Sequence, residues 1–136
     1  MRIMLDEGAI MPTRAHPYDA GLDLYAKEAG ILRHCSNESF DTGVHIEIPE
    51  GYVGIVKSKS GLMFKHHILT DGTIDSHYTG SIRVKLFNLN RREYRVQAGD
   101  KIAQLVIVKC ELPDLQVVDR LEETDRGNGG FGSTGR

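Results

Sequence analysis

The sequence has only two cysteines, Cys35 and Cys110, which lie far apart in the chain and form no CxxC spacing. Structural zinc sites and disulfide frameworks need more cysteines, or cysteines at short intervals. We therefore expect no zinc site and no disulfide framework. Both thiols are expected to be free and partly buried.

A block of basic residues and a long apolar run are also missing. The 17 Lys and Arg residues and 19 Asp and Glu residues give a formal net charge of −2, so general binding to nucleic acid or a membrane surface gets no support. No stretch approaches the roughly 20 apolar residues of a membrane span, and residues 1–10 lack the features of a signal peptide. We expect a cytoplasmic protein that binds anions only locally.

Helical periodicity is scarce, and short segments of alternating apolar and polar residues take its place. Residues 44–48 and 81–87 alternate in the manner of strands, and residues 101–108 form a longer run rich in β-branched residues that also predicts a strand. Turn signals occur at residues 48–52, 70–73 and 97–100. In the second of these strands, Ile82, Val84 and Leu86 share one face. The pattern predicts an all-β, jelly-roll-like domain.

One short helix is expected within this β domain. Residues 60–67 can form it, with Ser60 as the cap, and residues 118–124 can form one further turn. The final segment, residues 126–136, contains five glycines and too few apolar groups to fold alone. We predict a single domain over residues 1–125 and a flexible glycine-rich segment over residues 126–136.

Two segments carry polar groups where an anion could bind. Residues 57–64 place lysines, serines and a glycine at the start of the expected helix, where free N–H groups favour a phosphate. Gln104 lies among apolar residues of a strand and needs polar partners. Each feature also has an ordinary explanation, namely helix capping for the first and a solvent-facing glutamine for the second.

Two further segments carry carboxylates. Asp23 lies between two leucines, and in a strand it points away from their face, so on its own it suggests a surface aspartate. Asp75 and Tyr78 lie between two glycines in residues 71–80, which suits a tight β-hairpin. Such an aspartate could activate a water, and the tyrosine ring offers a flat surface for a sugar or base. The ordinary alternative is a hairpin with a solvated aspartate.

Taken together and in order, these segments resemble the five motifs of the trimeric dUTP pyrophosphatases, or dUTPases. The five are AGLDLYA (20–26), SKSGL (58–62), GTIDSHYTG (72–80), GDKIAQLV (99–106) and RGNGGFGSTG (126–135). They run from Ala20 to Gly135 and cover most of the chain. Any one could arise by chance, but five in order make coincidence very improbable.

The resemblance implies a reaction and an assembly. A dUTPase hydrolyses dUTP to dUMP and pyrophosphate with Mg²⁺, by attack of water on the α-phosphate. This reaction keeps uracil out of DNA and supplies dUMP for thymidylate synthesis. The family works as a homotrimer of jelly-roll subunits, in which each active site takes segments from all three chains.

The resemblance also implies roles for residues near the base and sugar. Asp75 would activate the attacking water, and Tyr78 would lie against the deoxyribose and exclude a 2′-hydroxyl group. The backbone at Thr73 and Ile74 would read the uracil edge, and the tight hairpin would exclude a C5-methyl group.

Phosphate and metal contacts are implied in the same way. Lys59, Ser60, Gly61 and Gln104 would contact the phosphates, and Asp23 would hold Mg²⁺ through its water shell. Arg83 would add a further contact to the substrate. An outer-sphere contact suits Mg²⁺ because this ion gives up its water reluctantly.

The glycine-rich segment would act as a lid on another subunit's site. Arg126 would grip the γ-phosphate, since its planar fork can bind phosphate bidentately. Phe131 would stack on the uracil ring, and Gly132, Ser133 and Thr134 would add further contacts.

Three positions depart from the family pattern: Lys59 replaces a frequent Arg, Leu69 a frequent Asn, and His77 a frequent acidic residue. Two other functions stay open at this stage. One is a dCTP deaminase, although the chain is short for that group. The other is a trimeric nucleotide-binding module that signals to a protein partner, which the presence of Asp75 and Tyr78 disfavours.

Overall fold

Short antiparallel strands make up most of the body of the chain. The computed structural model describes residues 1–130, which contain eleven strands and one short helix. The strands are β1 (Ile3–Leu5), β2 (Gly21–Tyr25), β3 (Gly30–Leu32), β4 (Asn37–Asp41), β5 (Val44–Ile46), β6 (Tyr52–Lys57), β7 (Ile68–Leu69), β8 (Asp71–Ile74), β9 (Arg83–Asn88), β10 (Tyr94–Val96) and β11 (Lys101–Lys109). The helix is α1 (Ser60–His66). These elements confirm the predicted all-β class with one short helix.

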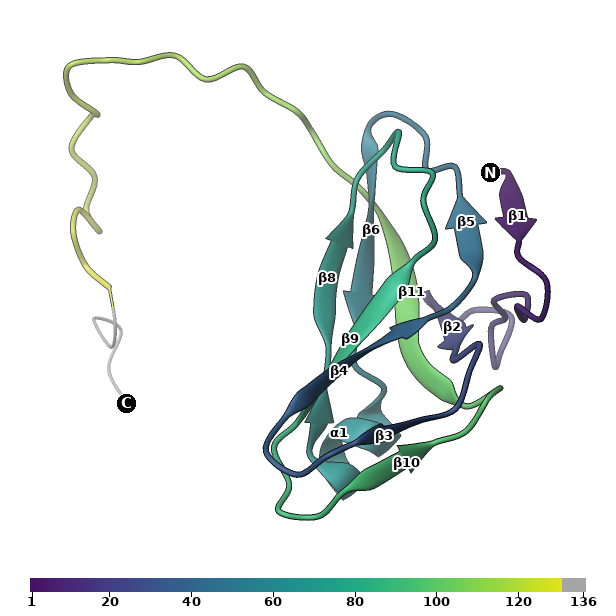
Figure 1. Cartoon of the computed structure of the whole chain (residues 1–136). Coiled ribbons are helices and arrows are strands. Elements are labelled where there is room, and N and C mark those ends of the chain that lie inside the picture. The colour runs from purple at the N-terminus through teal and green to yellow at the C-terminus, as the bar shows by residue number, and fades with distance from the viewer. Residues whose placement is uncertain (131–136) are drawn as a thin grey trace.

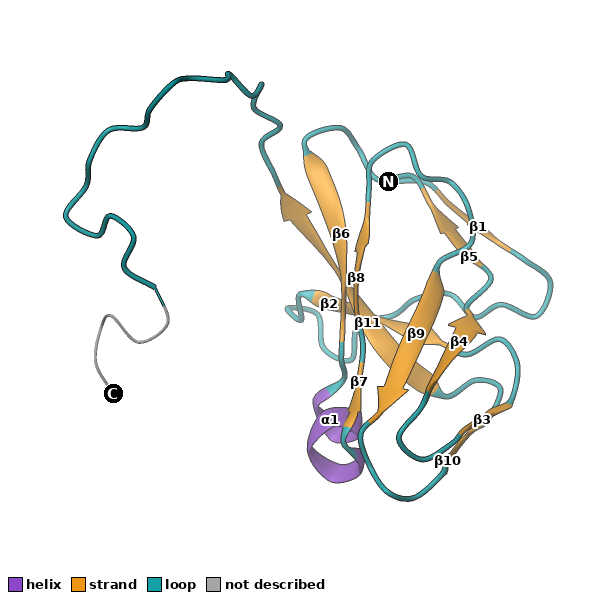
Figure 2. Cartoon of the chain, turned by 60° about the vertical axis from the view of Figure 1, so that its left-hand side comes forward, coloured by secondary structure: helices purple, strands orange, loops and turns teal. Residues whose placement is uncertain are grey.

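The largest sheet has the strand order β2-β11-β6-β8, and all of its neighbouring strands are antiparallel. A second sheet has the order β4-β9-β7, and the pairs β1-β5 and β10-β3 complete the body (Figure 1). Because β11 lies between β2 and β6, three segments that are distant in sequence meet along it. Figure 2 shows α1 at one end of the body, beside β7.

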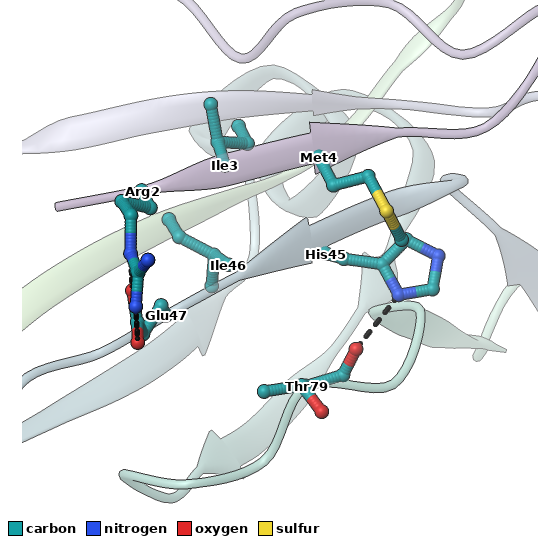
Figure 3. A pocket seen from close by; sticks show the side chains of 7 residues that line it. All are labelled: Arg2, Ile3, Met4, His45, Ile46, Glu47 and Thr79. Carbon is teal, nitrogen blue, oxygen red and sulfur yellow. Dashed lines mark hydrogen bonds and ion pairs between the residues drawn. The ribbon is translucent and has the colours of Figure 1, made fainter.

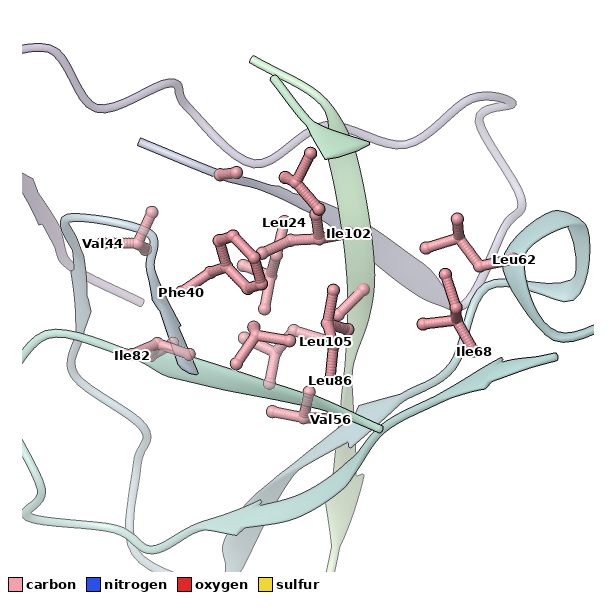
Figure 4. Packing of buried hydrophobic residues seen from close by; sticks show 14 of the residues in the cluster. Leu24, Phe40, Val44, Val56, Leu62, Ile68, Ile82, Leu86, Ile102 and Leu105 are labelled. Carbon is pink, nitrogen blue, oxygen red and sulfur yellow. The ribbon is translucent and has the colours of Figure 1, made fainter. Parts of the chain in front are cut away.

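The core lies between these sheets and consists of aliphatic side chains and one phenylalanine. Leu24, Leu86 and Leu105 are at most 1% exposed and face one another across the interior (Figure 4). Each buried leucine contributes about 2 kcal/mol through loss of apolar surface from water. Along β9, Val84 and Leu86 are buried while their neighbours are exposed, so the predicted apolar face is confirmed.

Asn88 is a polar residue inside this core, and all of its amide groups have partners. Its Nδ2 lies 3.0 Å from the carbonyl oxygen of Arg33 and 2.8 Å from that of Arg92, and its Oδ1 accepts the N–H of Asn90 at 2.9 Å. The side chain thereby joins the loop after β3 to the loop after β9. Because the residue is 1% exposed, water cannot replace these bonds.

Replacing Asn88 with Asp is therefore expected to lower the free energy of unfolding by about 3 kcal/mol or more. The new carboxylate would face carbonyl oxygens without a proton to donate. Urea unfolding measures the change, with Asn37→Asp on the exposed surface of β4 as the matched control. Equal stability of the two variants would show that the Asn88 network contributes little.

Four local predictions from the sequence are wrong. Residues 70–73 are not a turn, because 71–74 form β8. Residues 118–124 form no helical turn and are loop with a bend at Asp119. Ser60 does not cap the helix: Lys59 occupies the N-cap position and no side chain caps it. Residues 71–80 are not a hairpin, because β8 pairs with β6 while β9 pairs with β4 and β7.

The two cysteines are free, as predicted, although Cys35 is exposed rather than partly buried. The turns predicted at 48–52 and 97–100 are present. Within residues 1–130, no helix has the length and apolar character needed to cross a membrane.

Candidate active site

A buried carboxylate held by two lysines forms the centre of the candidate site. Asp23 lies in β2 and is 5% exposed. Lys59 forms an ion pair with its Oδ1, and the Nζ of Lys101 lies 2.7 Å from its Oδ2. Asp23 does point away from the core leucines, as the alternation predicts, but the two lysines cover it, so the interpretation as a surface aspartate is wrong.

The two lysines decide the charge state of this group. Burial of Asp23 works against ionisation, but hydrogen bonds from Lys101 and Lys59 outweigh it and hold the pKa of the carboxyl below its usual value. The same hydrogen bond to Asp23 raises the pKa of the Lys101 ammonium group. The cluster therefore carries one negative and two positive charges at neutral pH, a net positive charge suited to an anion.

Because the folded pKa of Asp23 is lowered, its ionisation stabilises the fold above the ordinary pKa of about 4, and this stability is lost as the pH falls. Asp23→Asn is expected to lower the free energy of unfolding by about 2 kcal/mol at neutral pH, and by much less at roughly pH 3. Urea unfolding across this range measures the difference. If the two proteins differed in unfolding free energy by the same amount at every pH, the lysines would not be what lowers the pKa of Asp23.

Lys101 is a member of this cluster that the sequence analysis missed. Strict alternation along β11 places residues 101 and 104 on opposite faces of the sheet. The pairing of β11 with β2 shifts between Lys101 and Ala103, so Lys101 pairs with Tyr25 while Gln104 pairs with Asp23. This β-bulge puts Lys101 and Gln104 on the same face, beside Asp23. A bulge has no reliable signature in a single sequence.

Gln104 lies at the middle of the central strand and joins this cluster to β6. It pairs with Asp23 on one side and with Lys57 on the other, and its Nε2 donates to the carbonyl oxygen of Ser58 at 3.1 Å. It is half-buried, so the interpretation as a solvent-facing glutamine is wrong. Gly21 makes room for it, since a Cβ at that position would collide with the amide oxygen.

The start of α1 lies next to the cluster. Lys59, the N-cap residue, has an extended backbone (φ −79°, ψ 134°), and the first turn contains no acidic side chain. Ser60 and Gly61 are exposed. Helix N-termini carry free N–H groups and partial positive charge. An anion bound at this end of α1 would therefore find hydrogen-bond donors and positive charge at Lys59, Ser60 and Gly61.

A second group of predicted residues lies on β8 and the loop that follows it. Thr73, Asp75 and Tyr78 are exposed, and Ile74 is half-buried. The Oη of Tyr78 donates to the carbonyl oxygen of Ser81 at 3.0 Å, which orients the ring over Gly80. His77 has a positive φ of 68° and is exposed.

These two groups are not brought together within one chain. Asp71 of β8 pairs with Lys57, and Ile74 pairs with Gly54 three residues back along β6. Those three residues span about 10 Å. Asp75 follows Ile74 at one end of the paired region of β6 and β8, whereas Lys59 follows Lys57 at the other end. The carboxylate of Asp75 is therefore more than about 10 Å from the Asp23 cluster.

Other predicted site residues also lie apart from the cluster. Arg83 is in the second sheet, where it pairs with Asp41 and lines a hollow with Glu28 and Glu38. Arg126 lies in the segment after β11, which runs away from the body (Figure 1), and its Nε donates to the carbonyl oxygen of Gly129 at 3.1 Å. Phe131, Gly132, Ser133 and Thr134 fall outside the described residues.

The donor set around Asp23 does not fit a directly coordinated metal. No group of three or more His, Cys, Asp or Glu side chains converges within residues 1–130. Both oxygens of Asp23 already face ammonium groups. The single carboxylate fits a cation that brings its own ligands, such as water or phosphate oxygens, and meets the protein through them.

Three comparisons with known proteins bear on the family of this chain. The sequence model of the dUTPase family matches residues 7–135. A deoxyuridine 5'-triphosphate nucleotidohydrolase of Corynebacterium glutamicum is 41% identical over 138 residues, covering 98% of this chain and 93% of the relative. The dUTPase of Staphylococcus bacteriophage 80alpha, solved with dUPNHPP, has a TM-score of 0.93 at 32% identity, covering 99% of this chain and 98% of that one.

A third comparison concerns a metal. A variant dUTPase from phage phi11 of S. aureus, whose structure shows a structural Mg(II) ion, has a TM-score of 0.83 at 31% identity, covering 90% of this chain and 98% of that one. Such matches over nearly the whole chain define the class of protein, a nucleotide hydrolase. The chain belongs to the dUTPase family.

Proposed function

We propose that the chain hydrolyses dUTP to dUMP and pyrophosphate, with Mg²⁺, by attack of water on the α-phosphate. The observation that carries the proposal is the dUTPase family match over residues 7–135, which includes all five sequence segments. In a cell this reaction keeps uracil out of DNA and provides dUMP for thymidylate synthesis.

Lys59, Ser60, Gly61 and Gln104 bind the phosphates in this proposal. The support is the net positive cluster around Asp23 and the uncapped start of α1 beside it. We add Lys101 to this set, because its ammonium group shares Asp23 with Lys59. A phosphate that approaches the cluster meets two cations whose positions are already fixed, which suits a reaction that depends on charge placement.

Asp75 is the general base, and Tyr78 is the platform for the deoxyribose. Asp75 is exposed, so it can receive a water and a substrate from outside the chain. The backbone of Thr73 and Ile74 reads the uracil edge, and Arg83 adds a substrate contact. Leu69 has no polar group for the base, so backbone groups carry more of the recognition.

Gly80 gives Tyr78 the space it needs. A Cβ at Gly80 would lie 2.6 Å from the Cζ of Tyr78, a distance that forces the ring to move. Gly80→Ala is expected to raise the KM for dUTP about tenfold. Steady-state kinetics measures this, and in a Tyr78→Ala background the same change should add little. An equal effect in both backgrounds would show that Gly80 acts independently of Tyr78.

The complete site forms between chains of a homotrimer. The support is the separation of Asp75 from the Asp23 cluster along β6. The segment 110–130 also leaves the body with Leu112, Leu115 and Leu121 exposed, as expected of a segment that packs on another copy. Residues 126–136 then close over a neighbouring site, where Arg126 binds the γ-phosphate, Phe131 stacks on uracil, and Gly132, Ser133 and Thr134 contact the substrate.

Asp23 holds Mg²⁺ through the water shell of the ion. When bound, Mg²⁺ would neutralise phosphate charge and orient the triphosphate. Lys59 and Lys101 keep Asp23 ionised, so the carboxylate can accept hydrogen bonds from water molecules on the ion.

The proposal is tested by pyrophosphate release from dUTP, dTTP, dCTP and UTP, each with Mg²⁺ and again with a chelator. We expect Mg²⁺-dependent release from dUTP alone. Equal release from dUTP and dTTP would show that the base pocket admits a C5-methyl group. Ammonia release from dCTP would instead indicate a deaminase, and binding of dUTP without any release would indicate a signalling module.

A further inference from the structure

Ser58 lies between the Asp23 cluster and β8 and forms hydrogen bonds in both directions, although the proposed reaction gives it no role. Its Oγ donates to the carbonyl oxygen of Thr70 at 2.9 Å and accepts the N–H of Thr70 at 2.8 Å. Its own carbonyl oxygen accepts a hydrogen bond from Nε2 of Gln104 at 3.1 Å. Ser58 therefore joins the end of β6 to the residue between β7 and β8 and to the central strand β11.

The two bonds with Thr70 fix the side chain of Ser58. Thr70 is 5% exposed, so water has little access to compete for its backbone groups. A hydroxyl group has a single proton, and here that proton is used on one backbone group while the oxygen accepts from another. Because Lys59 follows directly in the chain, this anchor also holds the N-cap residue of α1.

The carbonyl oxygen of Ser58 decides how the amide of Gln104 is turned. A carbonyl oxygen only accepts hydrogen bonds, so it faces the amino end of the amide. The amino group has two protons, of which one is used on Ser58 and the second is left for a ligand. The amide oxygen lies against Gly21, where a Cβ would be 2.2 Å from it. Ser58 and Gly21 thus hold the amide in an orientation that can donate to an anion.

Three groups of the candidate phosphate site depend on the backbone at Ser58. Lys59 and the start of α1 follow it directly, and Gln104 donates to its carbonyl oxygen. They meet at one place, because Lys59 forms an ion pair with Asp23 and Gln104 pairs with Asp23 across β11 and β2. A triphosphate presents acceptor oxygens and negative charge, which these donors and cations match.

The loop over residues 75–80 is anchored elsewhere. Figure 3 shows the ring of His45, whose Nδ1 lies 2.8 Å from the carbonyl oxygen of Thr79. Where the loop ends, the N–H of Ile82 donates to the carbonyl oxygen of Val44 at 2.8 Å. The strand before the loop, β8, is held by its pairing with β6. A change at Ser58 should therefore disturb phosphate binding and leave the base and sugar contacts in place.

We propose that Ser58 is a positioning residue for the triphosphate: anchored on Thr70, it fixes Lys59 and presents the amino group of Gln104 to the phosphates. The inference rests on the proposed function, which supplies its ligand. Ser58 acts without donating to the substrate, because its only hydroxyl proton is used on Thr70.

Two variants break this arrangement from opposite sides. Ser58→Ala removes both bonds with Thr70 and releases the backbone before Lys59. Gly21→Ala leaves Ser58 on Thr70 but displaces the side chain of Gln104, whose Cβ would lie 3.2 Å from the new Cβ. Ser58→Thr keeps the hydroxyl and is the conservative rescue. Thr70→Val is the matched control, because it removes a hydroxyl without a hydrogen-bond partner within residues 1–130 and keeps the backbone groups that hold Ser58.

The experiment is an NMR titration of each full-length protein with inorganic triphosphate and, separately, with deoxyuridine, both with Mg²⁺. Triphosphate probes the phosphate contacts, and deoxyuridine probes the base and sugar contacts. We expect the Kd of triphosphate to rise about tenfold in Ser58→Ala and in Gly21→Ala. The double variant should lose less than the product of the two, because both changes act through Gln104. Ser58→Thr and Thr70→Val should bind triphosphate as the wild type does, and deoxyuridine should bind equally to all.

An unchanged triphosphate Kd in Ser58→Ala would overturn the proposal. Equal losses of triphosphate and deoxyuridine affinity would also overturn it, because they would mean that the variant loosens the whole site. Thermal unfolding checks that each variant is folded. If Ser58→Ala does not fold, Ser58→Cys replaces it, with an expected rise of about threefold, since a thiol is a weaker partner for Thr70. Ser58-dependent triphosphate binding in a wild type that does not hydrolyse dUTP would refute the proposed function and support the positioning role.

Discussion

Asp75→Asn is expected to lower the turnover of dUTP by about 10²-fold or more while dUTP still binds. The reason is the role proposed for the carboxylate: an amide of the same shape can hold a water but cannot accept its proton. Asp75 is exposed and forms no described ion pair, so its replacement should leave the fold unchanged. The loss should therefore appear in kcat rather than in stability or affinity.

The measurement combines steady-state hydrolysis, calorimetric binding of a non-hydrolysable dUTP analogue, and thermal unfolding. Glu50→Gln, an exposed acid-to-amide change in the turn before β6, is the matched control and should behave as the wild type. Unchanged turnover in Asp75→Asn would remove this residue from the mechanism. Loss of analogue binding together with turnover would assign Asp75 to substrate binding instead.

The second large effect is expected from a chain that stops before Arg126. We expect turnover to fall about 10²-fold or more, because closure of residues 126–136 would supply γ-phosphate and base contacts and exclude water from the site. The shortened chain should remain folded, since no buried core residue lies beyond Leu105 within residues 1–130.

Hydrolysis, sedimentation and thermal unfolding of the shortened chain test this expectation. Arg126→Lys in the full-length chain is the matched comparison, because it keeps the charge and removes the bidentate geometry. We expect it to lose less activity than the truncation. Full activity of the shortened chain would show that the glycine-rich segment is dispensable.

Local patterns in the sequence account for much of the fold. Alternation along residues 81–87 identified the buried face of β9, and the apolar run at 101–108 identified the central strand. The failures were places where distant pairing decides the structure. Residues 71–74 look like a turn locally, yet they form β8 because β6 offers an antiparallel partner.

The candidate site was also predicted only in part, because distant pairing decides some of its contacts. Asp23, Lys59 and Gln104 were predicted through the resemblance, and they do lie together. Lys101 was missed because a bulge in β11 reverses the alternation between residues 101 and 104. The contacts of the His45 ring with the carbonyl oxygen of Thr79 and with Asp6 were also missed, because these partners are 34 and 39 positions away in the sequence. The roles of Asp75, Tyr78 and residues 126–136 remain predictions.

The central claim is that one chain supplies Asp75 and another supplies the Asp23 cluster of the same site. Co-expression of Asp75→Asn with Lys59→Ala tests it most directly, since each variant alone should retain roughly one-hundredth of the activity. Each mixed trimer would contain one site with both native residues, so random mixing should restore about a quarter of the wild-type rate. A mixture no more active than its parents would contradict the account, because it would mean that a single chain supplies both residues.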